Sequence, residues 1–306
     1  MLSKPAKLNA AYYGLILIWS TTYMFIKISV GDTPLMAATV RFVAAALILL
    51  LFQHFRGRSL RPVAGSAKVI FHIAVLNYGL GYGLTYWAMP YVYSNVVSLL
   101  WATMPMFVTL FAHFMVPGER FRWANALSLA LALYGSFLIF DVQSLKLGGA
   151  QSLAYLMIML SIAAAAYSNV FYKRTGNRIA LDAVLINAYG MLIGGVLLLI
   201  SSLLTEPWRT LNVDLPWIGA TLYLSVFGST AAFTVYFVLM KYFTVVKMSY
   251  TTFLIPIFDS VVGWMVLDEV LGGKTILGGA LILAGVVLPD LWRRYKRGRS
   301  QITASR

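Results

Sequence analysis

The most regular feature of the sequence is a series of apolar blocks, each about 20 residues long and separated by short polar linkers. A helix needs about 20 apolar residues to cross the hydrocarbon core of a bilayer, so each block predicts one membrane-spanning helix. The alternating polarity that is typical of transmembrane β-strands does not occur in these blocks. We therefore predict an all-α integral membrane protein with ten transmembrane helices, over residues 10–28, 34–54, 69–89, 94–116, 122–140, 152–172, 182–204, 215–240, 245–267 and 272–291.

Composition supports this class. Of the 306 residues, 60% are hydrophobic and 11% are charged, and the mean hydropathy is +0.79. Soluble domains are about 45–50% apolar and about 25% charged, so a water-soluble enzyme and a disordered protein are both excluded. The chain has no cysteine, which excludes disulfides, thiolate nucleophiles and cysteine metal sites.

The distribution of basic residues explains the net charge of +14. If both termini face the cytoplasm, 19 of the 24 lysines and arginines lie on that side, four lie on the other side, and Arg41 lies within a span. This asymmetry follows the positive-inside rule and predicts an even number of spans with both termini in the cytoplasm. The basic tail, Arg293–Arg299, then fixes the topology and contacts anionic lipid headgroups rather than nucleic acid.

The two halves of the chain resemble each other. In each half a glutamate follows a proline, by 14 residues in the first half and 13 in the second, and a glycine follows that glutamate by 16 residues. Each half contains five predicted spans, and an odd number forces the second copy into the membrane upside down, as in many secondary transporters. We therefore expect two inverted repeats, residues 1–148 and 149–306. The matched pairs are Pro105 and Pro256, Glu119 and Glu269, and Gly135 and Gly285.

These residues carry a family resemblance. The run Trp19-Ser-Thr-Thr-Tyr-Met-Phe-Ile-Lys27, the pair Arg41-Phe42 and the two Pro–Glu–Gly series resemble the drug/metabolite transporter superfamily, and within it the EamA group. The resemblance covers essentially the whole chain and implies a ten-helix carrier that exports small metabolites across the bacterial inner membrane. The aromatic richness is most similar to that of bacterial exporters of aromatic amino acids. One departure is Asp268 beside Glu269, where the family usually has a lone glutamate.

Three ionisable residues lie well inside the predicted spans, where an unpaired charge that faces lipid is costly. Arg41 has two interpretations: a clamp for a substrate carboxylate, or a structural tie to a helix end or a carboxylate such as Asp32. Asp259 could hold a substrate ammonium group, carry a proton, or pair with a structural partner. His113 is a candidate for packing more than for proton relay.

Aromatic and polar side chains at membrane depth predict a central cavity. Tyr78, Tyr82 and Tyr86 follow one another at helical spacing and place three hydroxyls on one helix face, which must face inward to find partners. Trp101 is also too deep for the interfacial belt. A cavity of this kind would stack a planar side chain, whereas the alternative for each residue is packing between helices. The other candidate substrate-binding residues are Thr21, Ser168, Asn187, Tyr250, Asp259 and Arg41, and the wider inventory includes Asn77, Tyr23 and Asn169.

The repeated prolines and glutamates are candidate hinge or gate residues. Proline removes a backbone hydrogen bond and kinks a helix, so Pro105 and Pro256 would weaken one helix in each half. Glu119 and Glu269 fall at loop junctions on opposite sides of the membrane, where they are expected to cap or tie neighbouring helices.

Together these features predict a secondary transporter of amino acids, with aromatic amino acids as the first candidate and efflux of cationic drugs or other metabolites as the alternative. The sequence has no Walker A pattern, so ATP hydrolysis is not the expected driving force. It has no HExxH or GxSxG motif, which leaves an intramembrane enzyme or a receptor as a remote alternative. We expect no cofactor, no metal and no nucleic-acid partner, and the chain to be a monomer or a homodimer.

Overall fold

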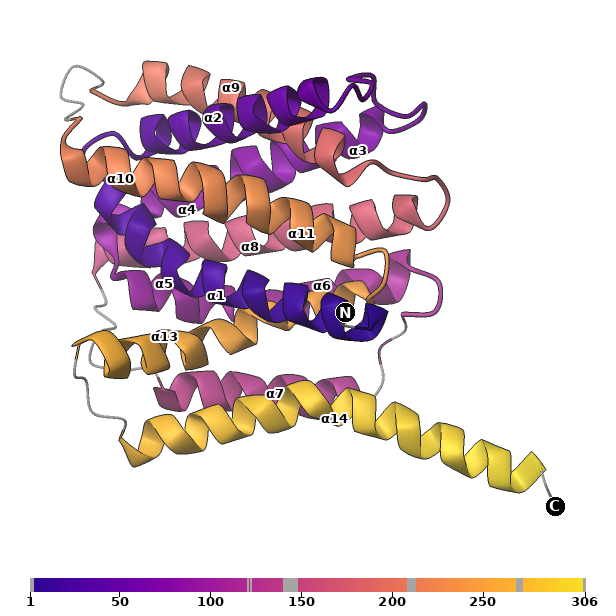
Figure 1. The fold of residues 1–306 in the computed structure, drawn as a ribbon. Helices are drawn as coiled ribbons and strands as arrows, with labels where there is room; N and C mark the ends of the chain where they lie inside the picture. The colour runs from indigo at the N-terminus through magenta and orange to yellow at the C-terminus, as the bar shows by residue number, and fades with distance from the viewer. Residues whose placement is uncertain are drawn as a thin grey trace.

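The computed structural model describes residues 3–119, 121, 123–139, 148–207, 213–267 and 272–304. Every element in this part of the chain is helical, which confirms the predicted all-α class. The helices run roughly along one common direction, and the two marked chain ends lie toward the same end of the bundle (Figure 1). The elements are α1 (Lys4–Val30), α2 (Pro34–Phe55), α3 (Ala67–His72), η1 (Ile73–Tyr82), α4 (Gly83–Ala88), η2 (Met89–Tyr91), α5 (Ser94–Trp101), α6 (Met104–Met115), α7 (Trp123–Ile139), α8 (Gly149–Gly176), α9 (Ala183–Thr205), α10 (Leu215–Tyr223), η5 (Leu224–Ala231), α11 (Ala232–Leu239), α12 (Val245–Ser249), α13 (Thr251–Leu267) and α14 (Gly273–Ala304).

Length and composition set which helices could cross a membrane. Within the described residues, six helical segments are long and apolar enough to do so, and three shorter apolar helices accompany them. The six are Lys4–Val30, Pro34–Phe55, Ser94–Met115, Gly149–Gly176, Ala183–Thr205 and Leu215–Leu239, and the shorter ones are Trp123–Ile139, Val245–Phe258 and Gly273–Pro289.

Local sequence explains where several helices begin. Pro34 occupies the first turn of α2, where its missing N–H costs nothing. Asp182 caps α9, because its carboxylate accepts from the backbone N–H groups of Val184 and Leu185 at 2.8 and 3.2 Å. Asp214 caps α10 in the same way.

Several predicted spans are not regular α-helices. The third predicted span contains the π-helical segment η1, and the eighth contains a second one, η5. The fourth is broken between α5 and α6 at Ala102–Thr103, and the ninth is broken at Tyr250 between α12 and α13. Pro105 therefore occupies the first turn of α6, whereas Pro256 lies inside α13. The kink expected at Pro105 is replaced by a break just before it, because proline is tolerated at a helix start.

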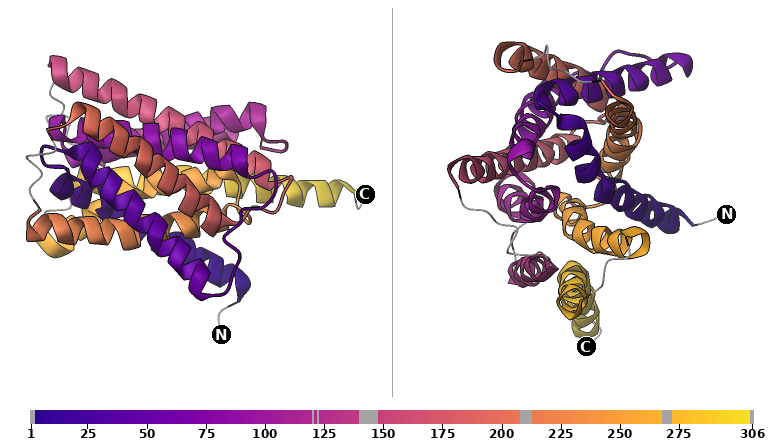
Figure 2. Two further views of the ribbon diagram at one scale, coloured as in Figure 1. Left: turned by 90° about the horizontal axis from the view of Figure 1, so that it is seen from above. Right: turned by 90° about the vertical axis from the view of Figure 1, so that its left-hand side faces the viewer.

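The packing of the second half repeats that of the first. The segment η1 packs on α8 and α9, and η5 packs on α1 and α2. Likewise α6 packs on α8, and α13 packs on α1. The two remaining large contacts lie between α2 and α9 and between α7 and α14, at opposite edges of the bundle (Figures 1 and 2).

Close approach between α7 and α14 depends on glycine. A Cβ atom built on Gly135 would lie 2.5 Å from the carbonyl oxygen of Gly278, and one built on Gly278 would lie 2.5 Å from the carbonyl oxygen of Gly135. Further along the same contact, a Cβ atom on Gly285 would lie 2.7 Å from the Ser128 carbonyl oxygen. The small residues at this crossing let the two backbones touch, as is common in membrane helix pairs.

Candidate functional site

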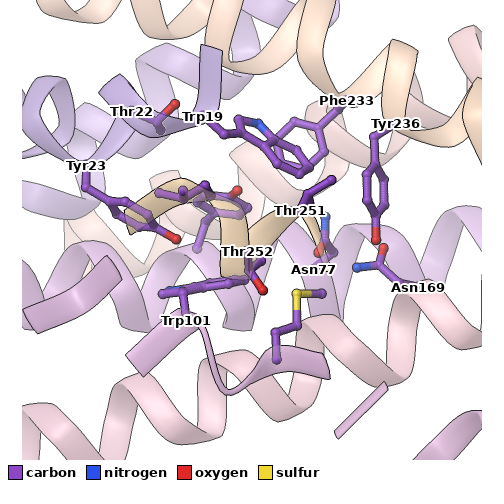
Figure 3. A pocket seen from close by; sticks show the side chains of 13 residues that line it. Trp19, Thr22, Tyr23, Asn77, Trp101, Asn169, Phe233, Tyr236, Thr251 and Thr252 are labelled. Atoms are coloured by element: carbon purple, nitrogen blue, oxygen red, sulfur yellow. The ribbon is translucent and has the colours of Figure 1, made fainter. Parts of the chain in front are cut away.

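A cavity lies at the centre of the bundle, where α1, η1, α5, α6, α8, α11 and α13 meet (Figure 3). About 30 Å³ of its volume is open to the centre of a water molecule. The lining residues are Trp19, Thr22, Tyr23, Asn77, Tyr82, Trp101, Met104, Asn169, Phe233, Tyr236, Thr251, Thr252 and Ile255.

Aromatic rings form a continuous wall of this cavity. The Trp19 ring contacts Phe233 and Tyr236, with centroids 5.4 and 5.2 Å apart. Tyr82 joins this group to Trp101, because its centroid lies 5.6 Å from that of Phe233 and 5.9 Å from that of Trp101. Two of these contacts, Trp19–Phe233 and Tyr82–Phe233, have the edge-to-face geometry that aromatic pairs prefer, and the other two are tilted. The wall is therefore suited to contact with a planar ring.

Five polar groups on the lining have no hydrogen-bond partner within the protein. They are the indole N–H groups of Trp19 and Trp101, the Asn77 amide nitrogen, the Asn169 amide oxygen and the Tyr236 hydroxyl. Each buried group of this kind costs about 1–3 kcal/mol when it stays unpaired. Of the eight such side-chain atoms among the described residues, five lie on this one cavity. Buried polar atoms without a partner in the protein are thus concentrated in residues that line the cavity.

Arg41 lies behind this wall and is fully buried. Its Nε donates to the Ser229 hydroxyl at 2.7 Å, and its two terminal nitrogens donate to the Tyr86 hydroxyl at 3.1 Å and the Gly228 carbonyl oxygen at 3.3 Å. The guanidinium carbon lies 5.2 Å from the Tyr82 ring centroid. The guanidinium group thus ties α2 to the π-helical segment η5, and it does not line the cavity. Of the two interpretations of Arg41, these contacts fit a structural tie between helices, although Asp32 is not among the partners.

Of the sequence candidates Tyr78, Tyr82, Trp101 and Asn187, two line the cavity. Tyr82 and Trp101 do, whereas Tyr78 and Asn187 do not. Tyr78 donates its hydroxyl to the Asn187 side-chain oxygen at 2.6 Å, which joins η1 to α9. The inward face of η1 presents Asn77 and Tyr82 to the cavity instead.

Two further candidates also point away from the cavity, and in each case a neighbour lines it. Thr21 bonds to the Tyr223 hydroxyl at 2.7 Å, while Thr22 and Tyr23 line the cavity. Ser168 donates to the His72 carbonyl oxygen at 3.3 Å, and its neighbour Asn169 is a lining residue.

The ninth span follows the same pattern. The Tyr250 hydroxyl accepts from Ser128 at 3.2 Å, and the next two residues, Thr251 and Thr252, form the wall. Sequence reasoning also missed Phe233 and Tyr236 on α11. Their signal was aromatic spacing at i, i+3, which is helical in the same way as the spacing of the tyrosines in the third span.

The hinge and gate candidates are positioned differently from one another. The Glu119 carboxylate accepts from the backbone N–H groups of Val245 and Val246 at 3.1 and 3.3 Å, so it caps α12. Glu269 lies outside the described residues, and so does the Asp259 side chain. His113 is exposed and its Nδ1 accepts from the Phe121 backbone N–H. No group of three or more metal-binding side chains occurs in the part of the chain that the structure describes.

Two lysine clasps, each a lysine ammonium bonded to two backbone carbonyls, recur at matching places in the two halves. Lys27, near the end of α1, donates to the carbonyl oxygens of Met89 and Val92 at 2.7 and 3.0 Å. Lys173, near the end of α8, donates to those of Met240 and Phe243 at 2.5 and 2.9 Å. Since α1 and α8 run in opposite directions, the clasps lie at opposite ends of the bundle (Figure 1).

A hollow accompanies each clasp. The hollow at Lys27 has about 230 Å³ open to the centre of a water molecule, and the hollow at Lys173 has about 240 Å³. Both are far roomier than the central cavity with its 30 Å³. A wide hollow therefore lies at each end of the bundle, and the central cavity offers much less open space.

Comparison with known proteins shows which family this chain matches. Residues 10–141 and residues 152–289 each match the EamA-like transporter family. The uncharacterized transporter YoaV of Bacillus subtilis is 26% identical, over 89% of this chain and 92% of the relative. The S-adenosylmethionine/S-adenosylhomocysteine transporter of Chlamydia trachomatis serovar L2 is 26% identical, over 82% and 79%.

Two further comparisons concern location and fold. The uncharacterized inner membrane transporter YedA of Escherichia coli K12 is 28% identical, over 93% of this chain and 90% of the relative. A solved crystal structure superposes with a TM-score of 0.79 at 18% identity, covering 95% of this chain and 98% of the other. At that identity the superposition establishes a shared fold.

Proposed function

The chain belongs to the EamA-like transporter family, and from this premise we propose that it is a secondary transporter that exports small metabolites from the cytoplasm by alternating access. The family match confirms the resemblance drawn from the sequence motifs. Amino acids with planar side chains are the first candidate substrates. The observation that carries this proposal is the central cavity, which combines an aromatic wall with five polar groups that lack partners within the protein.

The proposed architecture is ten membrane passes in two inverted repeats. Three observations support it: the two successive family matches, the recurrence of helix contacts between the halves, and the matching lysine clasps at opposite ends. An inverted repeat gives one fold in two orientations, so that each half can open toward its own side of the membrane. In this proposal both termini face the cytoplasm, at the end where the clasp of Lys173 lies.

Transport in this scheme requires the central cavity to enlarge. Only about 30 Å³ of the cavity is open to the centre of a water molecule, far less than in either hollow, so the cavity has to widen before it admits an amino acid. The helix breaks at Ala102–Thr103 and at Tyr250 lie beside the lining residues, so bending there widens the cavity without breaking regular helix. Pro256 lacks a backbone N–H inside α13 and lowers the cost of bending in that half. Each half then has one weak point for its own gate.

A second candidate substrate class is metabolites that carry a nucleobase. The Chlamydia relative is named a transporter of S-adenosylmethionine and S-adenosylhomocysteine. The unpaired amide nitrogen of Asn77 and the unpaired amide oxygen of Asn169 suit it, since asparagine amides donate to and accept from the edge of an adenine ring. Aromatic walls stack on nucleobases as readily as on aromatic side chains.

Counterflow in proteoliposomes without nucleotide tests the proposal. Preloaded vesicles should accumulate a labelled substrate from a panel of amino acids, adenosyl compounds and cationic dyes. Tyr82→Leu and Trp101→Leu should lower uptake at least tenfold, because both rings line the cavity. Trp123→Leu is the matched control, since Trp123 is 86% exposed on α7 and should retain transport. Strict dependence on ATP would refute the carrier mechanism, and normal uptake in both cavity variants would refute the site.

A further inference from the structure

Arg41 is an unusual residue for the interior of a membrane bundle, because its relative exposure is 0% and every partner the structure gives it is uncharged. Its hydrogen bonds go to two hydroxyls and one backbone carbonyl. Its guanidinium group also lies over aromatic faces, 5.0 Å from the ring centroid of Phe42 and 5.2 Å from that of Tyr82. These dipoles and π-faces stabilise the cation and leave its charge in place.

The charge of Arg41 persists because a guanidinium group does not lose its proton in proteins. A charge that no described carboxylate neutralises acts on its surroundings over several ångströms when little water screens it. Tyr82 connects it to the cavity, since the same ring that faces Arg41 also lines the cavity wall. The positive potential therefore extends to the position of a guest that stacks on the far side of Tyr82.

The lining reinforces this potential. Three of its five unpaired groups are N–H donors, from Trp19, Trp101 and Asn77, and a donor presents the positive end of its dipole. Among the lining residues that the structure describes, none is acidic and none is basic. The cavity thus offers donors and a buried cation nearby, with no described anion to hold a positively charged guest.

We propose that Arg41 is the specificity-determining charge of the carrier: acting through Tyr82 and without touching the solute, it selects planar solutes that carry a carboxylate and rejects organic cations. This inference rests on the proposed central site. A solute charge stacked beyond Tyr82 lies roughly 8 Å from the guanidinium carbon, and at an effective dielectric of about 20 two unit charges at that distance change an affinity about 30-fold. Arg41 thus acts on the charge of the solute from a distance and does not itself contact the solute.

The test compares three indoles of similar shape on the purified full-length protein: indole-3-propionate, which is anionic, indole-3-propanamide, which is neutral, and tryptamine, which is cationic. Binding is measured by isothermal titration calorimetry, with the amide as the reference that removes the shared ring contacts. The wild type should bind the propionate at least tenfold more tightly than tryptamine, with the amide between them. Equal binding, or tighter binding of tryptamine, would overturn the proposal without requiring any variant.

Two substitutions of Arg41 separate its charge from its packing. Arg41→Gln should reduce the propionate-to-amide affinity ratio by about 30-fold and raise the tryptamine-to-amide ratio by a similar factor, whereas Arg41→Lys keeps the charge, loses the planar fork and should keep both ratios within about threefold. A ratio that Arg41→Gln leaves unchanged would overturn the proposal. Both variants can have a lower melting temperature and still support the proposal, provided that only Arg41→Gln changes the affinity ratios. Loss of packing alone would not weaken the binding of an anion and strengthen the binding of a cation.

Asp259 provides the competing explanation, since it lies one turn after the lining residue Ile255 on α13. If the wild type prefers tryptamine and Asp259→Asn removes that preference, a carboxylate sets the selectivity and Arg41 does not. Failure here is distinguishable from failure of the proposed function. A protein that shows the charge preference in binding but no counterflow retains the inference about the cavity and loses the transport proposal, and one that moves cations by counterflow retains transport and loses the inference.

Discussion

The lysine clasps provide the sharpest mechanical prediction. Lys27 joins the end of α1 to the turn between η2 and α5, and Lys173 joins the end of α8 to the turn between α11 and α12. Because the clasps lie at opposite ends, we expect each of them to hold its own end of the bundle closed. Replacing Lys27 by methionine should favour the conformation open at its own end, and replacing Lys173 by methionine should favour the opposite one.

The size of the effect follows from the bonds that are lost. Each ammonium donates two hydrogen bonds, and a hydrogen bond to a charged group contributes about 1.5–3 kcal/mol. Water replaces part of this at exposed Lys27, so we take about 1.5–3 kcal/mol for the whole clasp rather than for each bond. A change of that size shifts the balance between two conformations by about 10- to 100-fold.

Absence of cysteine makes the measurement direct, because a single introduced thiol has no background. Thr22→Cys places that thiol on the cavity wall, where Thr22 is 4% exposed. A membrane-impermeant maleimide applied from one side of oriented vesicles then reports how often the cavity opens to that side. Lys27→Met should accelerate labelling from the Lys27 side alone, and Lys173→Met from the other side alone.

The control for charge is Lys241→Met, because Lys241 lines the same hollow as Lys173 and is itself exposed. It should leave both labelling rates within about twofold of the starting protein. If both clasp variants accelerate labelling from the same side, or if neither does, the clasps do not hold the two gates. Equal acceleration by Lys241→Met would assign the effect to surface charge.

Two further predictions concern packing and capping. Gly278→Ala should lower the melting temperature in detergent by a few degrees, because the new Cβ atom would meet the Gly135 carbonyl oxygen and overpacking costs about 1–3 kcal/mol. Gly279→Ala is the control: a Cβ atom there has nothing within 4 Å, so the substitution should be neutral or stabilising. Circular dichroism checks that both variants fold, and equal melting temperatures in two folded variants would contradict the close approach of α7 and α14. Glu119→Gln should destabilise the folded protein by about 1–2 kcal/mol, because α12 loses its charge-assisted cap. Glu206→Gln should have the same effect at α2, where the Glu206 carboxylate accepts from two backbone N–H groups at 2.6 and 3.0 Å. Unchanged melting temperatures in both variants would argue against these caps.

The hydropathy pattern located the helices well, because a bilayer imposes a length that can be counted along the chain. It did not locate the π-helical segments η1 and η5 or the break before Met104, since these depend on how neighbouring helices pack rather than on apolar length. The break still has a local signal: Thr103 and Pro105 lie where an α-helix can start again.

The rotation of each helix was harder to predict than its position. The sequence favours Thr21, Ser168 and Tyr250 for the cavity, yet Thr22, Asn169 and Thr251 line it. One residue corresponds to about 100° of rotation, and a helix that is apolar on nearly every face carries little periodic signal to fix that angle. The polar residues that point outward find partners on neighbouring helices, as Ser168 does at the His72 carbonyl. Hydroxyls alone therefore identify the right helix but not the right face.

The unpaired groups of the cavity also constrain what a substrate has to offer. Five residues of its lining each carry a buried polar atom with no partner in the protein. A solute that pairs with such an atom recovers about 1–3 kcal/mol for each group that otherwise stays unpaired. A purely apolar ring recovers none of this, however well it stacks on the aromatic wall. We therefore expect the best-binding solute to pair a planar ring with a polar edge, and we expect lipid tails, which have no polar edge, to bind poorly.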